Sequence, residues 1–579
     1  MSKPARFAVI VMFGGFLSIQ QGACADADVA SPTTRCAALS DSMARHWPDA
    51  STRVLSAHLV AAGPLPAATP PGAPPLSVDA PEHCELIAAT QERIGEAGQH
   101  YAIRFHLRMP LQWNGRLYFQ GGGGSNGVLG DALGVYSAAA APALVQGFTV
   151  VSQDSGHDNA INNDPARGGV LAFGFDEKAR ANYGHASLPV VAKAAKAVIK
   201  IFYGADVARS YFVGCSKGGE EGMALAQRYA SEFDGIAAGA PGMSLPRAAL
   251  AEAWDTQAFA ALVKSDTQQL SLDKVAASFS NPDLELVRAA VLAACDADDG
   301  VRDGIVGNFK NCGGEKVKPQ LKARQCKAEK ADGCLSMAQI NALTRVLGGA
   351  RDSQGKILYS DWPWDTGIAA AGWRIWKLGS PDGRPPSLNV LLGGASLASD
   401  FTTPPTPLSA DPGALLGFLL AFDFDRDAAK IYATDAAFPR SAWEDISARS
   451  ADLSAFRARG ARLLVTHGVS DPVFSINDTI AWWREVNERN GGNANQFVRL
   501  FPVPGMTHCG GGDATDQFDV LAPLMAWVEH GEPPDSIIAG ANPRTPWPKR
   551  TRPLCPYPAV AHYRGSGDTE VAANFECRS

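Results

Sequence analysis

The sequence lacks any apolar run long enough to cross a membrane as a helix. The longest such run, at 7–19, has thirteen residues, whereas a helix needs about 20 to span the hydrocarbon core. Lys3 and Arg6 precede this run, and the small residues Ala23, Cys24 and Ala25 follow it. This pattern is typical of a signal peptide. We therefore predict that residues 1–25 are removed and that the mature protein is secreted or periplasmic.

Charge is also scarce and nearly balanced. Charged residues make up 19% of the 579 residues, and the net charge is −7. Neither nucleic acid nor an anionic membrane would be attracted by such a field, so we expect neither as a partner. The hydrophobic fraction of 46% is ordinary for globular proteins and excludes wholesale disorder. The length predicts several domains, or one large domain with an insertion.

No C-x-x-C pair occurs, which disfavours zinc binding and thioredoxin-like chemistry. Ten cysteines follow residue 25, and an even number in an exported chain predicts disulfides. Short spacing suggests three local pairs, although spacing alone does not fix connectivity. These pairs are Cys295 with Cys312, Cys326 with Cys334, and Cys555 with Cys577.

Strand-like and helix-like segments alternate along much of the chain. The strand-like runs lie at 101–107, 116–120, 148–152, 210–213, 462–466 and 497–501, and 185–202 is helix-like. The alternation predicts an α/β fold with a mostly parallel sheet. Residues 61–81 are rich in Pro and Ala, which predicts a surface loop before the first strand.

A long stretch without strand-like runs interrupts this pattern. It predicts a lid domain at 241–456, inserted between core segments at 26–240 and 457–579, because the strands resume afterwards. Loop-rich insertions are common places for binding sites.

The sharpest chemical motif is Gly-Cys-Ser-Lys-Gly at 214–218, a G-x-S-x-G sequence. It follows a predicted strand and precedes a predicted helix at 220–229, which is the context of a nucleophile elbow. Ser216 is therefore the candidate nucleophile, and the Lys217 N–H is a candidate oxyanion donor. Cys215 would be an alternative nucleophile only if its thiol stayed reduced.

The acid and the base of such a site follow the serine in sequence. Asp471 stands in the loop after the predicted strand 462–466 and is the candidate acid, although an Asp before Pro also commonly caps a turn. Three histidines follow it. His530 lies at a predicted helix end and His562 in a late loop, whereas His508 follows the strand 497–501 and enters a glycine-rich loop. We therefore predict His508 as the base.

Cysteines flank both proposed catalytic residues. Cys215 precedes Ser216 and Cys509 follows His508. One disulfide between them would hold the two loops together.

A second glycine-rich run occupies 121–127 and follows a predicted strand. It matches G-x-G-x-x-G from Gly122, but that dinucleotide motif is weak without a following βαβ unit. We favour an oxyanion loop in which the Gly123 N–H acts beside that of Lys217.

Four carboxylates fall within eight residues at 296–303 and are interleaved with glycines. Carboxylate and carbonyl oxygens are the ligands that Ca²⁺ prefers. We predict a calcium site formed by the side chains of Asp296, Asp299 and Asp303 and the carbonyls of Val301 and Ile305. A solvated acidic turn is the alternative.

With these motifs, the sequence resembles the tannase and feruloyl esterase family over essentially the whole mature chain. The resemblance implies an α/β-hydrolase core with a large inserted lid domain and a structural Ca²⁺. It also implies that His467 and Phe474 line the substrate cleft. Finally, it implies five disulfides, which are the three local pairs together with Cys36–Cys84 and Cys215–Cys509.

The resemblance predicts a secreted serine esterase acting on small aromatic esters of the feruloyl or galloyl type. Hydrolysis of mono(2-hydroxyethyl) terephthalate to terephthalate and ethylene glycol is the alternative. Residues 385–410 contain no Arg or Lys to hold a free carboxylate, and the nearest cations are Arg374, Lys377 and Arg384. A further alternative is a hydrolase-like binding protein without activity.

Overall fold

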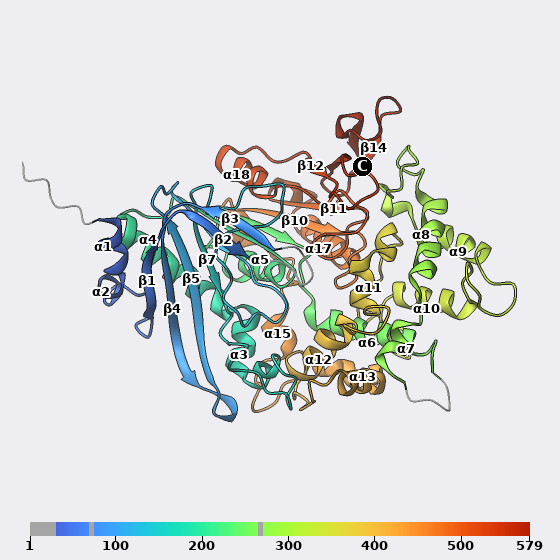
Figure 1. The fold of residues 1–579 in the computed structure, drawn as a ribbon, viewed down its shortest axis with the longest axis horizontal. Coiled ribbons are helices and arrows are strands. Elements are labelled where there is room, and N and C mark those ends of the chain that lie inside the picture. Colours follow the sequence, from blue (N-terminus) through green and yellow to red (C-terminus); the bar gives the residue numbers. More distant parts are fainter. Residues whose placement is uncertain (1–30, 69–74, 265–269) are drawn as a thin grey trace, which may run out of the picture.

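The computed structural model describes residues 31–68, 75–264 and 270–579, so the signal peptide predicted at 1–25 lies outside them. A nine-stranded sheet with the order β1-β4-β5-β7-β6-β8-β9-β10-β11 extends from the left side of the molecule, at β1, to its middle, at β11 (Figure 1). In the described ranges, no helix is long and apolar enough to cross a membrane.

The sheet is mixed rather than uniformly parallel. The six strands from β7 to β11 run parallel, whereas β1, β4 and β5 are antiparallel to their neighbours. The strands are β1 (Arg53–Val60), β4 (His83–Ile94), β5 (His100–Pro110), β6 (Arg116–Gln120), β7 (Thr149–Gln153), β8 (Arg209–Cys215), β9 (Gly235–Gly239), β10 (Arg462–Gly468) and β11 (Val498–Val503).

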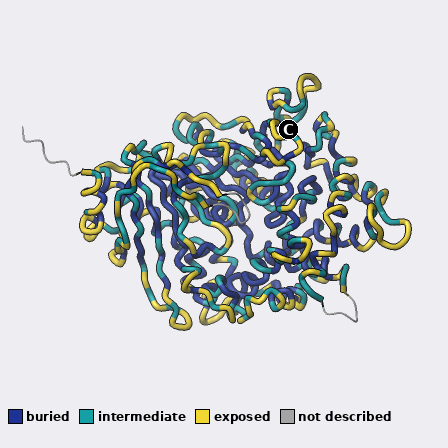
Figure 2. Tube along the Cα trace, viewed as in Figure 1, coloured by how far each residue is buried: buried dark blue, intermediate teal, exposed yellow. Residues whose placement is uncertain are grey.

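Apolar side chains alternate between the two faces of the sheet, as the pleat of a strand requires. Tyr211 and Leu464 belong to one buried cluster, and their chain neighbours Phe212 and Leu463 belong to the other. Helices α4 (Ser187–Tyr203), α5 (Lys217–Arg228) and α18 (Leu521–His530) pack against the strands. Figure 2 shows the buried chain gathered in the centre and the exposed chain at the loops.

The prediction of a surface loop at 61–81 before the first strand is wrong. β1 precedes this segment, and the segment itself forms a two-stranded ribbon from β2 (Gly63–Ala67) and β3 (Leu76–Ala80). Pro64 and Pro66 lie in β2, where a two-stranded ribbon leaves one edge without hydrogen-bond partners and so tolerates residues that lack an N–H.

Between β9 and β10 the chain forms helices, and in the described residues 240–264 and 270–461 it adds no strand to the sheet. The longer helices are α6 (Leu245–Ala260), α8 (Asn281–Cys295), α9 (Gly314–Ala323), α10 (Met337–Leu347) and α13 (Pro412–Ala421), beside the shorter α11 (Ala371–Lys377) (Figure 1). One apolar cluster includes Phe119 of the sheet and Trp373 of α11. The helices therefore share a core with the sheet, and the division at 241–456 stays a prediction.

Five disulfides connect the ten cysteines of the described chain in the pairs that the family resemblance implies. The three local pairs have sequence separations of 8 to 22 residues, and Cys36–Cys84 has one of 48. The fifth, Cys215–Cys509, links residues 294 positions apart. The pairs are Cys36–Cys84, Cys215–Cys509, Cys295–Cys312, Cys326–Cys334 and Cys555–Cys577.

Candidate active site

Ser216 stands alone in a sharp turn between β8 and α5, with φ 64° and ψ −120°. A non-glycine residue pays a conformational cost in this region, which persists only where the surroundings enforce it. Close packing does so here. A Cβ atom on Gly218 would lie 2.7 Å from the Gly122 carbonyl oxygen. The glycine of the motif thus lets α5 approach the loop at 121–127.

Ser216, His508 and Asp471 form one hydrogen-bonded chain. His508 Nε2 lies 2.8 Å from Ser216 Oγ, and His508 Nδ1 lies 2.8 Å from Asp471 Oδ2. The three residues follow β8, β10 and β11, which run parallel. Parallel strands end at one edge of the sheet, so residues from distant parts of the chain meet there.

The environment of Asp471 keeps its carboxyl group ionised. Burial alone would raise its pKa, but the charge of His508 and hydrogen bonds from His467 and His508 outweigh burial and hold the pKa below its ordinary value. Its Oδ1 also accepts the N–H groups of Val473 and Phe474 at 2.8 and 3.1 Å. The carboxylate is thereby fixed in position and can orient the imidazole.

His467 does not line the cleft as the family resemblance implied. Its side chain is fully buried, with Nε2 3.0 Å from the Phe474 carbonyl oxygen and Nδ1 3.0 Å from Thr479 Oγ1. It therefore supports the loop of Asp471 from beneath. Phe474 does line the cleft, and its ring centroid lies 5.3 Å from that of His508.

The two predicted oxyanion donors differ in their availability. The Lys217 N–H belongs to the first turn of α5, where helical N–H groups have no intrahelical acceptor. The Gly123 N–H already donates to Asn126 Oδ1 at 2.8 Å. The prediction for Gly123 is therefore not supported in this conformation, and Gly124 and Ser125 are the residues of that loop that line the cleft.

Sequence reasoning missed Glu221, which binds the loop at 121–127 to α5. Its carboxylate accepts the Gly122 N–H at 2.9 Å and the Asn126 side-chain amide at 2.7 Å. Its position five residues after Ser216, inside the helix that follows the elbow, was the available clue.

Asp365 was also missed, and it connects the acid loop to the base loop. Its Oδ2 accepts the Ser470 hydroxyl and the Gly505 N–H, both at 2.7 Å. Nearby, the Trp362 indole donates to the Asp471 carbonyl oxygen at 3.1 Å. No local sequence pattern distinguishes either residue.

A narrow cleft of about 60 Å³ opens beside Ser216, and we call it the serine cleft. Lys217 and Glu252 are the acidic or basic residues in its lining, which is otherwise largely apolar. The Lys217 amine pairs with Glu220 and lies 4.6 Å from the centre of the Tyr183 ring. Aromatic and aliphatic side chains of the lining are Leu171, Tyr183, Leu245, Trp376, Leu392, Phe401, Val473 and Phe474.

Trp376 also lines a larger cavity, of about 910 Å³, that includes His508. Arg288 and Arg544 lie in its lining, and Arg288 pairs with Asp513 at 2.7 Å. The site thus has a small cleft beside Ser216 and a larger cavity beside His508, and Trp376 lines both.

None of the three cations nearest to residues 385–410 lines the serine cleft. Arg374 is buried and donates to the carbonyl oxygens of Phe279 and Ala276 at 2.7 and 2.8 Å. Lys377 is buried against Asp255. Arg384 is exposed.

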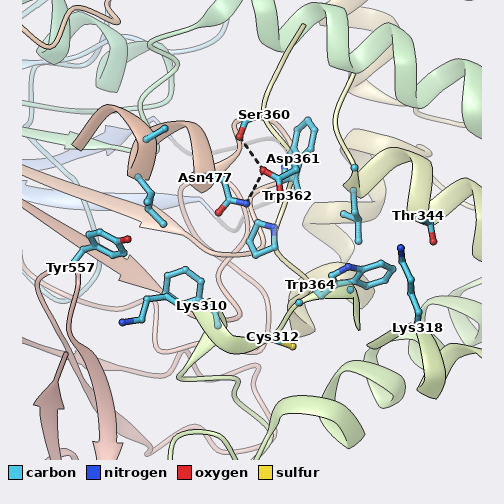
Figure 3. Close-up of a pocket in the computed structure, with 18 of the residues that line it drawn as sticks. Lys310, Cys312, Lys318, Thr344, Ser360, Asp361, Trp362, Trp364, Asn477 and Tyr557 are labelled. Carbon is cyan, nitrogen blue, oxygen red and sulfur yellow. Dashed lines mark hydrogen bonds between the residues drawn. The ribbon is translucent and has the colours of Figure 1, made fainter. Parts of the chain in front are cut away.

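Another cavity, of about 590 Å³, shares no lining residue with the serine cleft and is shown in Figure 3. Trp362, Trp364, Lys310 and Tyr557 contribute to its wall, and Asp361 accepts a hydrogen bond from Asn477 at 3.2 Å. It contains none of the three residues of the hydrogen-bonded chain. It is larger than the serine cleft, so size alone does not identify the cavity that holds the nucleophile.

The carboxylates of the predicted calcium segment are close, but they point to different partners. Burial and neighbouring Asp303 raise the pKa of Asp299 to about 7. Asp296 Oδ1 accepts the Gly304 N–H at 3.0 Å, and Asp303 pairs with Arg552. The N–H groups of Val301 and Ile305 donate to Asp299 and Asp303. Over the described ranges, no group of three or more His, Cys, Asp or Glu side chains is arranged to hold a metal.

Comparison with known proteins gives a consistent result. The family model for tannase and feruloyl esterase matches residues 84–578. A mono(2-hydroxyethyl) terephthalate hydrolase from Piscinibacter sakaiensis is 43% identical, over 92% of this chain and 89% of that protein. A probable feruloyl esterase from Arthroderma benhamiae is 30% identical, over 81% of each chain.

Solved structures share the fold at lower identity. Feruloyl esterase B from Aspergillus oryzae has a TM-score of 0.74 and 21% identity, covering 95% of this chain and all 100% of that one. The tannin acyl hydrolase from Aspergillus niger has a TM-score of 0.65 and 19% identity, covering 94% and 95%.

Proposed function

Because this chain belongs to the tannase and feruloyl esterase family and is a carboxylic ester hydrolase, we propose that it cleaves esters of phenolic aromatic acids through an acyl-enzyme on Ser216. The observation that carries this proposal is the continuous hydrogen-bonded chain from Ser216 through His508 to Asp471. The family membership removes support for a binding protein without activity.

In the proposed reaction, Ser216 Oγ attacks the ester carbonyl while His508 Nε2 takes its proton. Asp471 orients the imidazole and stabilises its cationic form. The imidazolium then protonates the leaving alcohol, and water cleaves the acyl-enzyme by the same steps. The Lys217 N–H supports the oxyanion, and removal of one such donor typically costs about 3 kcal/mol of transition-state stabilisation.

The aromatic acyl group is proposed to occupy the serine cleft, whose side chains suit a ring. A free carboxylate on that ring would lose its hydration without meeting an unpaired cation, because Lys217 pairs with Glu220. A phenol hydroxyl needs only one hydrogen-bond partner. These considerations favour phenolic esters over mono(2-hydroxyethyl) terephthalate, whereas the 43% identity to a hydrolase of that compound supports the alternative.

Initial-rate kinetics with three esters tests the proposal. We expect kcat/KM for methyl ferulate or methyl gallate to exceed that for mono(2-hydroxyethyl) terephthalate, with Ser216→Ala as the control for background hydrolysis. A terephthalate value tenfold above both phenolic esters would establish the alternative substrate class instead.

Two further features belong to the proposal. Export is supported by the five disulfides, which persist in oxidising compartments. A structural Ca²⁺ at Asp296, Asp299 and Asp303, with the carbonyls of Val301 and Ile305, is supported by the burial of Asp299 and by its nearness to Asp303 and Asp296, which together raise its pKa. The cation would neutralise that charge and take no part in the ester chemistry.

A further inference from the structure

A buried carboxyl group lies in the serine cleft and receives no hydrogen bond from the residues that the structure describes. Glu252 of α6 lines the cleft together with Ser216, and it is only 6% exposed. Throughout the described part of the chain, no side chain or backbone N–H donates to its carboxyl oxygens, and no ion pair ends on them. Buried polar groups are normally hydrogen-bonded, so an unpaired one facing a cleft calls for a ligand.

One face of α6 and the helical segment opposite it position this carboxyl group in the cleft. Leu245, Ala248, Ala249 and Glu252 all line the cleft and follow the i, i+3, i+4, i+7 spacing of one helix face. Across from this face lies the helical segment Asn389–Gly394. A Cβ atom at Gly393 would collide with Glu252 Oε2. The absence of a side chain at Gly393 therefore leaves the space that the carboxyl group occupies.

The surroundings of Glu252 do not supply enough positive charge to ionise it at neutral pH. Lys377 of α11 pairs with Asp255, one turn further along α6, and Tyr359 lies near enough for the charge of Glu252 to contribute to the rise of the Tyr359 pKa. Burial is the main cause that raises the pKa of Glu252 to about 8, with a contribution from Asp255 and an opposing one from Lys377. A neutral carboxyl group offers one O–H donor and one carbonyl acceptor.

We propose that Glu252 is a specificity-determining residue that exchanges hydrogen bonds with a hydroxyl group on the aromatic ring of the acyl moiety. This inference rests on the proposed function. A ring hydroxyl both donates and accepts, so it satisfies both oxygens of a neutral carboxyl group. A hydrogen atom in its place leaves the carboxyl group unpaired, and sites built to bond a hydroxyl group discriminate strongly against its absence.

Two matched ester pairs and two variants test the proposal. The pairs are methyl 4-hydroxycinnamate with methyl cinnamate, and methyl 4-hydroxybenzoate with methyl benzoate. The measured quantity is the ratio of kcat/KM for the hydroxylated ester to that for its unsubstituted partner. We expect Glu252→Leu to lower this ratio about tenfold or more in at least one pair, and Glu252→Gln to preserve it within about threefold, because the amide keeps a donor and an acceptor.

The pH dependence separates this role from a merely structural one. Between pH 7 and 9 the wild-type ratio should change by more than that of Glu252→Gln, because deprotonated Glu252 no longer donates to the ring hydroxyl and accepts from it as an anion, whereas the amide does not titrate. Ionisation of the substrate is the same in both proteins. Should Glu252→Leu not fold, Gly393→Ala, which pushes the carboxyl group out of its place, is expected to lower the ratio in the same direction.

Each outcome has a clear meaning. Equal ratios in the wild type and in folded Glu252→Leu, while all four esters are hydrolysed, would overturn the inference alone. A wild-type enzyme that hydrolyses none of the four esters would overturn the proposed function, and the inference with it.

Discussion

Removing the disulfide between Cys215 and Cys509 should impair turnover more than stability alone explains. The perturbation is the double variant Cys215→Ser and Cys509→Ser. The disulfide joins the residue before Ser216 to the residue after His508, whose reacting atoms lie 2.8 Å apart. Without it, the base loop is still held by the bond from Gly505 to Asp365, but its end nearest the serine is released.

The contribution of this disulfide to stability is estimated from the length of the loop that it closes. A sequence separation of 294 corresponds to about 5.7 kcal/mol of chain entropy at 25 °C, as an upper estimate. The disulfide Cys326–Cys334, with a separation of 8, corresponds to about 2.5 kcal/mol and is a matched control outside the site. In addition, a displacement of about 1 Å between reacting groups can cost roughly 100-fold in rate.

The assay measures kcat for an aromatic ester and the thermal unfolding of both double variants, at a temperature where circular dichroism shows both folded. We expect the Cys215/Cys509 variant to lose about 100-fold in kcat and the Cys326/Cys334 variant to lose less than threefold. Equal turnover in the two variants would refute the reasoning, since the disulfide would then stabilise the fold without positioning the catalytic loops.

Three further predictions concern the hydrogen-bonded chain of Ser216, His508 and Asp471, the loss of stability at acidic pH, and the calcium segment. Ser216→Ala and His508→Ala should each lower kcat for ester hydrolysis by roughly 10³ or more with an unchanged circular dichroism spectrum, and full activity in either would remove the mechanism. The pKa of Asp471 is depressed in the folded state, so its contribution to stability is present above pH about 4 and lost as the pH falls further. In denaturant unfolding, the free energy of unfolding of the wild type should exceed that of Asp471→Asn by an amount that decreases as the pH falls towards 3. A difference that stays constant between pH 3 and 7 would contradict this. Excess chelator should lower the melting temperature of the wild type and change that of Asp299→Asn much less, whereas an immediate loss of activity without any change in melting would argue against a structural ion.

The local motifs were readable because their chemistry is confined to a few neighbouring residues. The G-x-S-x-G sequence specifies a tight turn, since the glycines at 214 and 218 permit contacts that a Cβ atom would block. The strand-like run at 116–120 coincides with β6 because a continuous apolar run is typical of a strand buried on both faces. The prediction at 61–81 failed because local Pro content does not reveal whether a strand has a free edge.

Long-range contacts, in contrast, were decided by the tertiary structure. The sequence by itself determined the order of the serine, acid and base, the parity of the cysteines and the class of fold, all of which depend on composition and spacing. Only the folded chain buries His467 beneath the acid loop, engages the Gly123 N–H with Asn126, and turns Arg374 away from the serine cleft. It also places Glu252 in that cleft, where none of the described residues donates a hydrogen bond to its carboxyl group. These features depend on which groups from distant segments share a buried space, and hydrogen-bond satisfaction and desolvation in that space are set in three dimensions.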